Sequence, residues 1–365
     1  MITRFTSSGG LGAVERGAEL GAAFGPQVKV AVERYARLFG IPPAERVAAG
    51  AQALDAIDGW APELAQEIRG IAAGAGVAVE EVAALNARTE VLALARAAGA
   101  GPGAGGRGEC SAVVALGGPG AEPVAGQNWD WYAGLADGWL VWEIPRPDGR
   151  RTVTLTEYGI VGKIGINSSG VGCLFNILHH QRDGAAAAGV PVHVIARRLL
   201  DEADDVAAAV AIAGAARVTA STAITVAGDQ RAGKAAVTLE VWPGGPDRVL
   251  PGADGLLLHT NHFLARRPAL GDTGPATAPD TLARHEVLRR WLAGPGRDTT
   301  ADLLASVLSD HTGGAYAICS HQPAGADGEQ EFQTLASVRL DFAACDLDVT
   351  DGPPCGGGYA GAEGT

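Results

Sequence analysis

The first 97 residues carry apolar side chains at the spacing of an α-helix. From Gln27 to Phe39 the apolar positions recur every three or four residues, so they fall on one helical face. Pro26 suits the first turn of this helix, and Gly40 suits its end. The same pattern recurs in three further segments, which open at Pro43, at Pro62 and at Val79, the last running to Leu94. We expect four amphipathic helices, and we favour the interpretation that they cover a sheet from the rest of the chain over an independent bundle.

After the first 109 residues the pattern changes to short runs of alternating β-branched and polar residues, separated by turns such as Gly117-Gly118-Pro119-Gly120 and Asn167-Ser168-Ser169-Gly170. These runs predict strands at 111–116, 123–131, 139–144, 152–156, 163–166, 172–178, 222–226, 236–242 and 256–259. Helical spacing returns at 191–200, 206–213, 282–292 and 301–308. A last hairpin is predicted to pair Ala315–Cys319 with Thr334–Leu340.

Groups of hairpins separated by pairs of helices are typical of antiparallel sheets covered by helices. The predicted fold class is therefore α+β with a layered architecture. The segment from Ala98 to Gly108 is mostly Gly and Ala, which suits a flexible and exposed backbone. Because no long polar linker follows it, we expect the helical part and the hairpins to form one integrated domain.

Composition narrows the classes of function. The chain has 365 residues, 47% of them hydrophobic and 19% charged, as in a globular protein with a large core. A net charge of −13 argues against nucleic acids and anionic membrane surfaces as partners. Residues 1–5 lack the apolar run of a signal peptide and no stretch is long enough to span a bilayer, so we expect a cytoplasmic protein. The five cysteines lack Cys-x-x-Cys spacing, so we predict neither a disulfide framework nor a metal or other cofactor.

Cys110 stands at a position where its thiol can act as a nucleophile. It heads the first predicted strand directly behind the flexible segment, so its thiol is placed to attack the carbonyl that precedes it. If the first hairpin folds about its glycine-rich turn, positions that sum to about 240 lie opposite each other, which sets Cys110 across from Asp130. A carboxylate there can hold a neighbouring amine or amide in position. From spacing alone, a cap on the strand end explains Asp130 equally well.

Four motifs follow one another in a characteristic order. They are Cys110, then Gly126-Gln127-Asn128-Trp129-Asp130-Trp131, then the run from Glu157 to Asn167, and then His259-Thr260-Asn261-His262. Together they resemble the isopenicillin N acyltransferase family of N-terminal nucleophile hydrolases. The resemblance covers most of the chain and includes Leu85 to Glu90 in the helical part.

The resemblance implies an αββα sandwich, two antiparallel sheets between helical layers, in a precursor that cuts itself between Glu109 and Cys110. It implies a helical small chain, residues 1–109, that stays associated with a large chain, residues 110–365. It also implies amide hydrolysis or acyl transfer through a thioester on Cys110. In that chemistry Asp130 would assist the cut and organise the new terminus, and Asn261 would contribute to the oxyanion hole. The expected substrate is an N-acyl amide or an acyl thioester such as acyl-CoA.

The residue types suit this chemistry. A free α-amino group on Cys110 has an ordinary pKa of about 7.7–8.0 and sits beside the thiol, so it can act as a general base without a histidine. An asparagine amide can donate to a negatively charged oxygen without ionising. Without the resemblance, a turn-forming role is the better interpretation of Asn261.

Other residues are weaker candidates. Ser221 or Thr222 falls where the family places a hydroxyl near its pocket, and Asn176 is a candidate for substrate binding, although a buried structural amide explains it better. The run Gly228 to Lys234 resembles a phosphate-binding loop, but Ala235 stands where Ser or Thr is required, so we reject it. We interpret the remaining histidine and cysteine candidates as structural, solvated or buried groups; they are His179, His180, His262, Cys173, Cys319, Cys345 and Cys355.

The neighbourhood of the last strands differs from the fungal acyltransferase of this family. Where that enzyme has an arginine and a Ser-Arg pair, this chain has Ser320-His321 and Gln330-Glu331. Loss of the basic pair weakens the case for a penicillin-type carboxylate as substrate. Two other classes stay open: a histidine-dependent cysteine hydrolase that uses Cys110 or Cys319 with His321, and a non-enzymatic relative in which Cys110 is inert.

Overall fold

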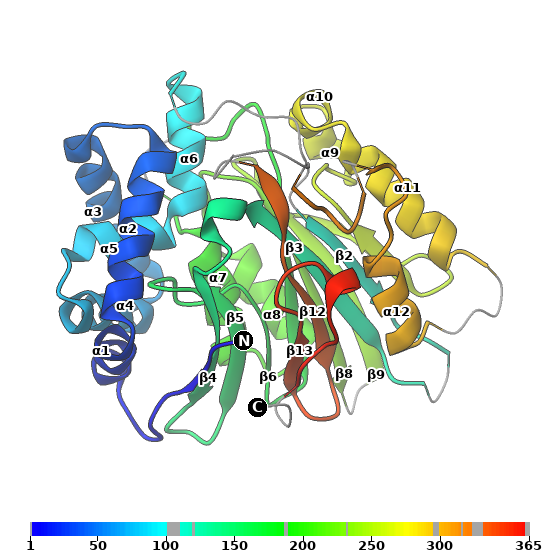
Figure 1. The fold of residues 1–365 in the computed structure, drawn as a ribbon, viewed down its shortest axis with the longest axis horizontal. Helices are drawn as coiled ribbons and strands as arrows, with labels where there is room; N and C mark the ends of the chain where they lie inside the picture. Colours follow the sequence, from blue (N-terminus) through cyan, green and yellow to red (C-terminus); the bar gives the residue numbers. More distant parts are fainter. Residues whose placement is uncertain are drawn as a thin grey trace.

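Two β-sheets lie face to face with helices on their outer sides in the computed structural model (Figure 1). The structure describes residues 2–100, 110–118, 121–185, 189–230, 233–294, 299–314, 317–322 and 331–361. The predicted cleavage residue Glu109 and most of the flexible segment lie outside the described residues, whereas Cys110 lies within them. Among the described residues, no helix is long and apolar enough to cross a bilayer.

The larger sheet has eight strands in the order β1-β4-β5-β6-β7-β8-β9-β10. Their bounds are β1 Arg4–Thr6, β4 Trp139–Pro145, β5 Arg151–Glu157, β6 Ile164–Asn167, β7 Val171–Ile177, β8 Thr222–Gln230, β9 Gly233–Val241 and β10 Asp247–Val249. Neighbouring strands are antiparallel except β1 and β4, which are parallel. The expectation of a purely antiparallel sheet and a purely helical N-terminal part was wrong here, because the N-terminal segment supplies the edge strand β1.

The smaller sheet has five antiparallel strands in the order β11-β2-β3-β12-β13. Their bounds are β2 Cys110–Ala115, β3 Val124–Tyr132, β11 Leu256–His259, β12 Phe332–Asp341 and β13 Asp346–Val349. The first predicted hairpin is confirmed as β2 and β3. The last one was wrong, because β12 uses its two edges to pair with β3 and β13. Residues 317–319 form bends instead of a strand, and 315–316 lie outside the described residues.

Helices cover the outer face of each sheet. Against the larger sheet lie α7 (Val192–Glu202) and α8 (Val206–Gly214); against the smaller sheet lie α11 (Asp280–Leu292) and α12 (Ala301–Leu308). The short helices α9 (Arg266–Ala269) and α10 (Gly274–Thr277) precede α11. Between the helical layers, β2 packs against β7, and β13 packs against β5 and β6. The predicted αββα sandwich is confirmed.

The N-terminal helices form a separate group beside the sandwich, seen at the left of Figure 1. Their bounds are α1 Ala13–Ala23, α2 Gly25–Phe39, α3 Pro43–Trp60, α4 Pro62–Ala75, α5 Val79–Asn86 and α6 Arg88–Ala97. Helix α2 ends at Gly40, whose φ of 62° is the left-handed conformation that glycine adopts readily. The predicted helix from Val79 to Leu94 is two helices that meet at Ala87, and α1 was missed.

A buried ion pair cluster attaches this helical group to the sandwich. Helices α1 and α4 touch closely, since a Cβ on Gly17 would lie 2.1 Å from the Glu67 carbonyl oxygen. The close contact brings Arg16 to Glu67, with Nε 2.6 Å from the carboxylate. Glu67 also accepts a hydrogen bond from Arg197 of α7 at 2.6 Å. The helices pack beside the sandwich and are joined to it by buried ion pairs (Figure 1).

Candidate active site

Cys110 is the first residue of β2 and is 3% exposed. Side chains alternate between the two faces of a strand. Cys110, Ala112 and Val114 belong to the core between the sheets, whereas Val113 belongs to a separate core beneath α11 and α12. The Cys110 thiol therefore faces the larger sheet in the interior of the sandwich.

Asn261 lies directly against the backbone of Cys110. Its side-chain Oδ1 accepts a hydrogen bond from the Cys110 N–H at 3.0 Å, and its Nδ2 donates to the Ile177 carbonyl at 2.9 Å. The Asn261 N–H donates to Thr281 Oγ1 at 2.7 Å, which fixes the residue just beyond the end of β11. The structure thus brings together two of the three predicted catalytic residues, although they are 151 positions apart in the sequence.

Arg284 completes this group, and sequence reasoning missed it. From α11 its guanidinium donates to the Cys110 carbonyl at 2.6 Å and to Asn261 Oδ1 at 3.0 Å. Its Nε donates to Asp280 Oδ2 at 3.1 Å, so the buried charge is paired. Arg284 stands four positions before Leu288, on the face that α11 buries. The available signal was the spacing of Asp280, Arg284 and Leu288, which puts an acid–base pair on the helical face that also carries Leu288 and Leu292.

Asp130 is not opposite Cys110. The register of β2 and β3 pairs Cys110 with Trp129, so the prediction was one residue off. The reason is that the connection between the paired residues Ala115 and Val124 is one residue shorter than predicted. A shift of one residue moves a side chain to the other face of a sheet. Buried Asp130 accordingly lies on the outer face, where it accepts a hydrogen bond from Thr334 Oγ1 at 2.6 Å.

A lysine lies on the inner side of the sheet, near Cys110. Lys163 Nζ is 3.5 Å from the centre of the Trp129 ring, and Trp129 is the cross-strand partner of Cys110. Burial lowers the pKa of Lys163 to about 7; Glu157 opposes this shift and Arg88 adds to it. Lys163 also interacts electrostatically with Cys110. A titratable cation therefore accompanies the thiol inside the sandwich.

Glu157 holds Lys163 in place and collects two further donors. Its carboxylate accepts from Lys163 Nζ at 2.8 Å and from Arg88 Nε at 3.1 Å, and it also accepts from the Tyr35 hydroxyl. Trp131 Nε1 donates to the Tyr35 oxygen at 2.8 Å. Burial raises the pKa of Glu157, but the charges of Arg88 and Lys163 outweigh it and hold the pKa below its usual value. The carboxylate therefore stays ionised and links α2 and α6 to the floor of the site.

The weaker candidates make structural hydrogen bonds. Ser221 Oγ donates to Asp183 Oδ1 at 2.6 Å, and Thr222 Oγ1 donates to the Asn176 carbonyl at 3.1 Å. Asn176 Nδ2 donates to the His259 carbonyl at 3.4 Å across the space between the sheets. The Ile177 carbonyl accepts from Asn261, and Ile177 follows Asn176 in the chain and pairs with Thr222 across the sheet, so both candidates lie beside a residue that contacts the site.

Two histidines singled out in the sequence, His180 and His262, contact residues other than Cys110. The His180 ring lies 4.7 Å from the Trp242 ring, and His262 Nδ1 is 3.1 Å from Thr281 Oγ1. Burial lowers the pKa of His262 to about 3, so this ring is neutral. A cysteine and a histidine do meet elsewhere, because Cys319 Sγ is 3.5 Å from His321 Nε2. That contact is the one the alternative histidine-dependent hydrolase requires.

Comparison with known proteins gives the family. Residues 117–354 match the family model described as acyl-coenzyme A:6-aminopenicillanic acid acyl-transferase. The chain belongs to this family. Membership of the acyl-transferase family makes it an enzyme of acyl transfer or hydrolysis and confirms the family that the motifs indicated.

Individual proteins are similar to this chain to different degrees. The chain is 30% identical over 294 residues to the 40 kDa form of acyl-coenzyme A:6-aminopenicillanic-acid-acyltransferase from Emericella nidulans, over 80% of this chain and 76% of the relative. A Caenorhabditis elegans ortholog of N-acylethanolamine-hydrolyzing acid amidase matches with 17% identity and a TM-score of 0.44, over 63% of this chain and 92% of its own. Penicillin V acylase from Agrobacterium tumefaciens matches with 12% identity and a TM-score of 0.41, over 66% and 83%.

We predict that Lys163→Met removes a pH dependence of stability. The pKa of Lys163 in the folded protein is about 7, below the ordinary lysine value of about 10.4. Below pH 7, Lys163 is protonated in the folded and the unfolded protein, and its buried charge lowers the free energy of unfolding by the full amount. This loss of stability disappears as the pH rises toward 10. The free energy of unfolding should therefore rise over this range by a few kcal/mol with Lys163 present, and less without it. Urea unfolding measures this slope, with the variants compared in a Cys110→Ala background.

Lys29→Met is the matched control, because Lys29 is exposed on α2. It should leave the slope between pH 7 and pH 10 as it is in the background protein. An equal slope in Lys163→Met and Lys29→Met would show that Lys163 does not titrate in this range.

Proposed function

We propose that this protein is a self-cleaving amide hydrolase or N-acyltransferase that uses Cys110 as its nucleophile. The observation that carries the proposal is the contact of the Cys110 backbone with Asn261 and Arg284 at the buried head of β2. Family membership supports the acyl chemistry. Cys110 heads its strand, so a cut directly before it would turn it into a chain terminus with an amine and a thiol on one residue.

In the proposed cleavage the Cys110 thiol adds to the carbonyl carbon of Glu109. The C–N bond then breaks, its nitrogen takes a proton and becomes the Cys110 α-amine, and a thioester joins Glu109 to the Cys110 sulfur. Water hydrolyses this thioester, which leaves a carboxylic acid on Glu109 and restores the thiol. Glu109 lies outside the described residues, so the geometry of attack is part of the proposal.

The new amine would serve as the general base in each later turnover. Asn261 Oδ1 accepts the Cys110 N–H in the uncut chain, and it would accept an amine hydrogen in the same place. The Arg284 guanidinium contacts the same Asn261 oxygen at 3.0 Å. A nearby positive charge disfavours protonation of the amine, which lowers its pKa and keeps more of it as the free base near neutral pH.

The proposed turnover has two acyl-transfer steps. The Cys110 sulfur attacks the substrate carbonyl as the amine takes the thiol proton, and the leaving amine or thiol departs with that proton. Water or an acceptor amine then attacks the acyl thioester and restores the thiol. In both steps negative charge develops on the carbonyl oxygen, and we assign an N–H of Asn261 to stabilise it. The hydrogen bond from Asn261 Nδ2 to the Ile177 carbonyl at 2.9 Å holds this side chain beside Cys110.

The two chains produced by the cut would stay together. We propose a small chain of residues 1–109 and a large chain of residues 110–365. β1 would then belong to the small chain and β4 to the large one, although they are paired in one sheet. The buried Glu67–Arg197 ion pair and the cluster around Glu157 would also cross between the chains.

Asp130 keeps its proposed role in cleavage, but by an indirect route. The Asp130 side chain projects from the outer face of the sheet, whereas the thiol lies on the inner face. Asp130 is therefore not positioned to act on the Cys110 sulfur by direct contact. It is buried one residue beyond the Cys110 partner Trp129, and it fixes the end of β3 to Thr334 of β12. We propose that Asp130 positions the backbone at the head of β2 for the cut.

A second candidate function rests on the Cys319–His321 contact. Cys319 Sγ is 3.5 Å from His321 Nε2, which is the arrangement of a thiol with a general base. A hydrolase of this kind would need no self-cleavage. The third class is a binding protein without catalysis. It would keep the sandwich, and its Cys110 would be inert. Intact mass separates self-cleavage from both.

We predict that purified wild-type protein consists of two co-purifying chains and that Cys110→Ala yields one. The thiol is the group that attacks the preceding carbonyl, so its removal leaves the peptide bond intact. Intact-mass measurement places the cut before residue 110. Cys173→Ala is the matched control, because Cys173 is another fully buried thiol of the same core and should not affect the cut.

Active wild-type protein that remains one chain would refute self-cleavage. Asp130→Asn extends the same measurement: it keeps the side-chain size, removes the charge, and should slow the cut. Cleavage of Asp130→Asn at the wild-type rate would leave Asp130 a strand-end residue only.

We predict that Asn261→Ala loses about 100- to 1,000-fold in kcat, the typical effect of removing one oxyanion donor. Asn261→Asp is the informative companion. It keeps an oxygen for the Cys110 amine and for Arg284 but removes the N–H donors, so it should be cut and still turn over slowly. Turnover of Asn261→Ala within threefold of the wild type would exclude an oxyanion role.

We further propose that the substrate is an N-acyl amide or an acyl thioester whose amine part is neutral or cationic. A buried carboxylate needs a charge-assisted partner, and losing one member of such a pair costs about 2–5 kcal/mol. The basic pair of the fungal relative is absent, and Glu331 stands near its place. Four arginines are candidates to replace it: Arg182, Arg197, Arg217 and Arg339. Two of them are already paired, Arg197 with Glu67 and Asp201, and Arg339 with Asp348.

We predict that the processed enzyme hydrolyses N-acylated neutral or basic amines faster than it acylates 6-aminopenicillanic acid from acyl-CoA. The two rates are compared by chromatography, with Cys110→Ala as the blank for background hydrolysis. Efficient acylation of the penicillin nucleus with little hydrolysis of the amine amides would overturn this substrate class and leave the Cys110 mechanism standing.

A further inference from the structure

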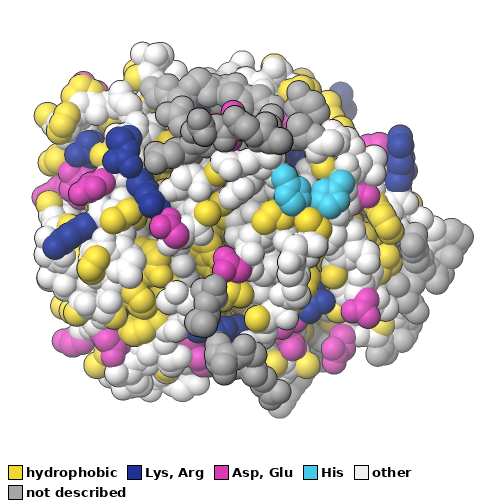
Figure 2. Space-filling model, in the orientation of Figure 1, with side chains coloured by type: hydrophobic (Ala, Val, Ile, Leu, Met, Phe, Trp, Pro, Cys, Tyr) yellow, Lys and Arg dark blue, Asp and Glu magenta, His cyan; other side chains and the backbone are white. Residues whose placement is uncertain are grey.

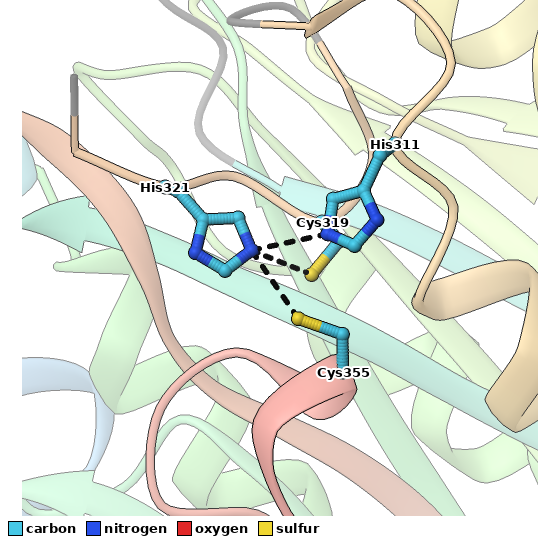
Figure 3. Close-up of side chains that lie close together, drawn as sticks. All are labelled: His311, Cys319, His321 and Cys355. Atoms are coloured by element: carbon cyan, nitrogen blue, oxygen red, sulfur yellow. Dashed lines mark hydrogen bonds between the residues drawn. The ribbon is translucent and has the colours of Figure 1, made fainter. Parts of the chain in front are cut away.

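Two histidines and two cysteines from three separate segments meet at the surface (Figure 3). His311 follows α12, Cys319 and His321 lie in the segment before β12, and Cys355 lies in the short helix η3 (Pro354–Gly356). Their nitrogen and sulfur atoms all lie within 4.8 Å of one another. Cys319 is buried beneath the other three, which are exposed, and histidines gather at one place on the face shown in Figure 2.

Hydrogen bonds do not account for this convergence. His321 Nε2 lies 3.1 Å from His311 Nε2, 3.5 Å from Cys319 Sγ and 3.3 Å from Cys355 Sγ. A ring nitrogen has either one hydrogen to donate or one lone pair to accept. It can therefore satisfy one of these three neighbours, whereas a cation at the centre would satisfy all four side chains at once.

The spacing suits a tetrahedral zinc ion. Zinc lies about 2.0–2.1 Å from histidine nitrogen and about 2.3 Å from cysteine sulfur. In a tetrahedron these bond lengths put two nitrogens about 3.3–3.4 Å apart, nitrogen and sulfur about 3.5–3.6 Å apart, and two sulfurs about 3.8 Å apart. From His321 Nε2 the observed distances are 3.1 Å to nitrogen and 3.3 and 3.5 Å to sulfur, close to these values, and the other pairs of ligand atoms lie within 4.8 Å.

We propose that His311, Cys319, His321 and Cys355 form a structural zinc site. The donor set has two thiols and two imidazoles and no carboxylate, which favours zinc over magnesium or calcium. On binding, the two thiols lose their protons to solvent, and two thiolates with one Zn²⁺ give a neutral site. All four positions of a tetrahedral ion are filled by protein atoms, so the site is structural and not catalytic.

Hydrogen bonds link the proposed zinc site to Asp130. Ser320, between two of the ligands, exchanges two hydrogen bonds with Thr334, each of 3.0 Å. Thr334 Oγ1 in turn donates to Asp130 Oδ1 at 2.6 Å. A bound zinc ion would therefore hold the segment before β12 and the helix η3 against the outer side of β3.

The test is the zinc content of the full chain. Protein grown with zinc is purified without chelators under reducing conditions and dialysed against a zinc buffer, and zinc per chain is measured by mass spectrometry. We expect about one zinc per chain in the wild type and at least tenfold less in Cys355→Ser and in His311→Gln, whose side chains are exposed. Cys345→Ser is the matched control, because its thiol is outside the cluster, and it should keep its zinc.

Cobalt gives a second measurement that does not depend on enzyme activity. Cobalt-loaded wild type should show the thiolate charge-transfer band and the visible bands of a tetrahedral site, and Cys355→Ser, which is expected to bind metal at least tenfold less, should lose most of this intensity. Wild type that holds no more zinc than Cys355→Ser would overturn the proposal. A disulfide between Cys319 and Cys355 in protein kept reduced, or equal loss of zinc in Cys345→Ser, would also overturn it.

Discussion

The arrangement around Cys110 depends on one buried carboxylate. Glu157 accepts hydrogen bonds from Tyr35 on α2, from Arg88 on α6 and from Lys163 just before β6. Removing such charges from water costs several kcal/mol per ion unless they are paired, so no member of the cluster can be lost cheaply while the others stay buried. Lys163 in turn covers the Trp129 ring beside Cys110. The Glu157 carboxylate therefore holds both Lys163, beside the Cys110 partner Trp129, and the N-terminal helices α2 and α6 in place.

Further contacts join the N-terminal segment to the sandwich. Asn86 of α5 donates to the Gly159 carbonyl at 2.8 Å and accepts from the Val161 N–H at 3.0 Å. Together with β1 at the edge of the larger sheet, these bonds tie the segment to the sandwich along its length. A cut before Cys110 would therefore free the amine without freeing the helices. The segment is better regarded as part of the scaffold of the site than as a propeptide to be discarded.

The sequence predicted the elements well and the register poorly, for physical reasons. Local period and turn residues determine where strands and helices lie, so β11 and α12 were placed to the residue. Register depends on the exact length of a connection, and one residue in the first hairpin moved Asp130 to the other face of the sheet. Arg284 was missed because its partners, Cys110 and Asn261, are 174 and 23 positions away. The Cys and His cluster was missed for the same reason, since its members come from three segments that only the fold brings together.

The two faces of the smaller sheet separate two kinds of influence on Cys110. On the inner face, Lys163 acts on the thiol through space, and such an effect changes with its protonation near pH 7. On the outer face, hydrogen bonds join Asp130 and Thr334 to the segment that carries Cys319 and hold β3, the strand beside β2. In the proposed mechanism, inner-face groups would therefore act on the reactivity of the sulfur in each turnover. Outer-face groups would act on the position of the strand head, which matters most for the proposed self-cleavage.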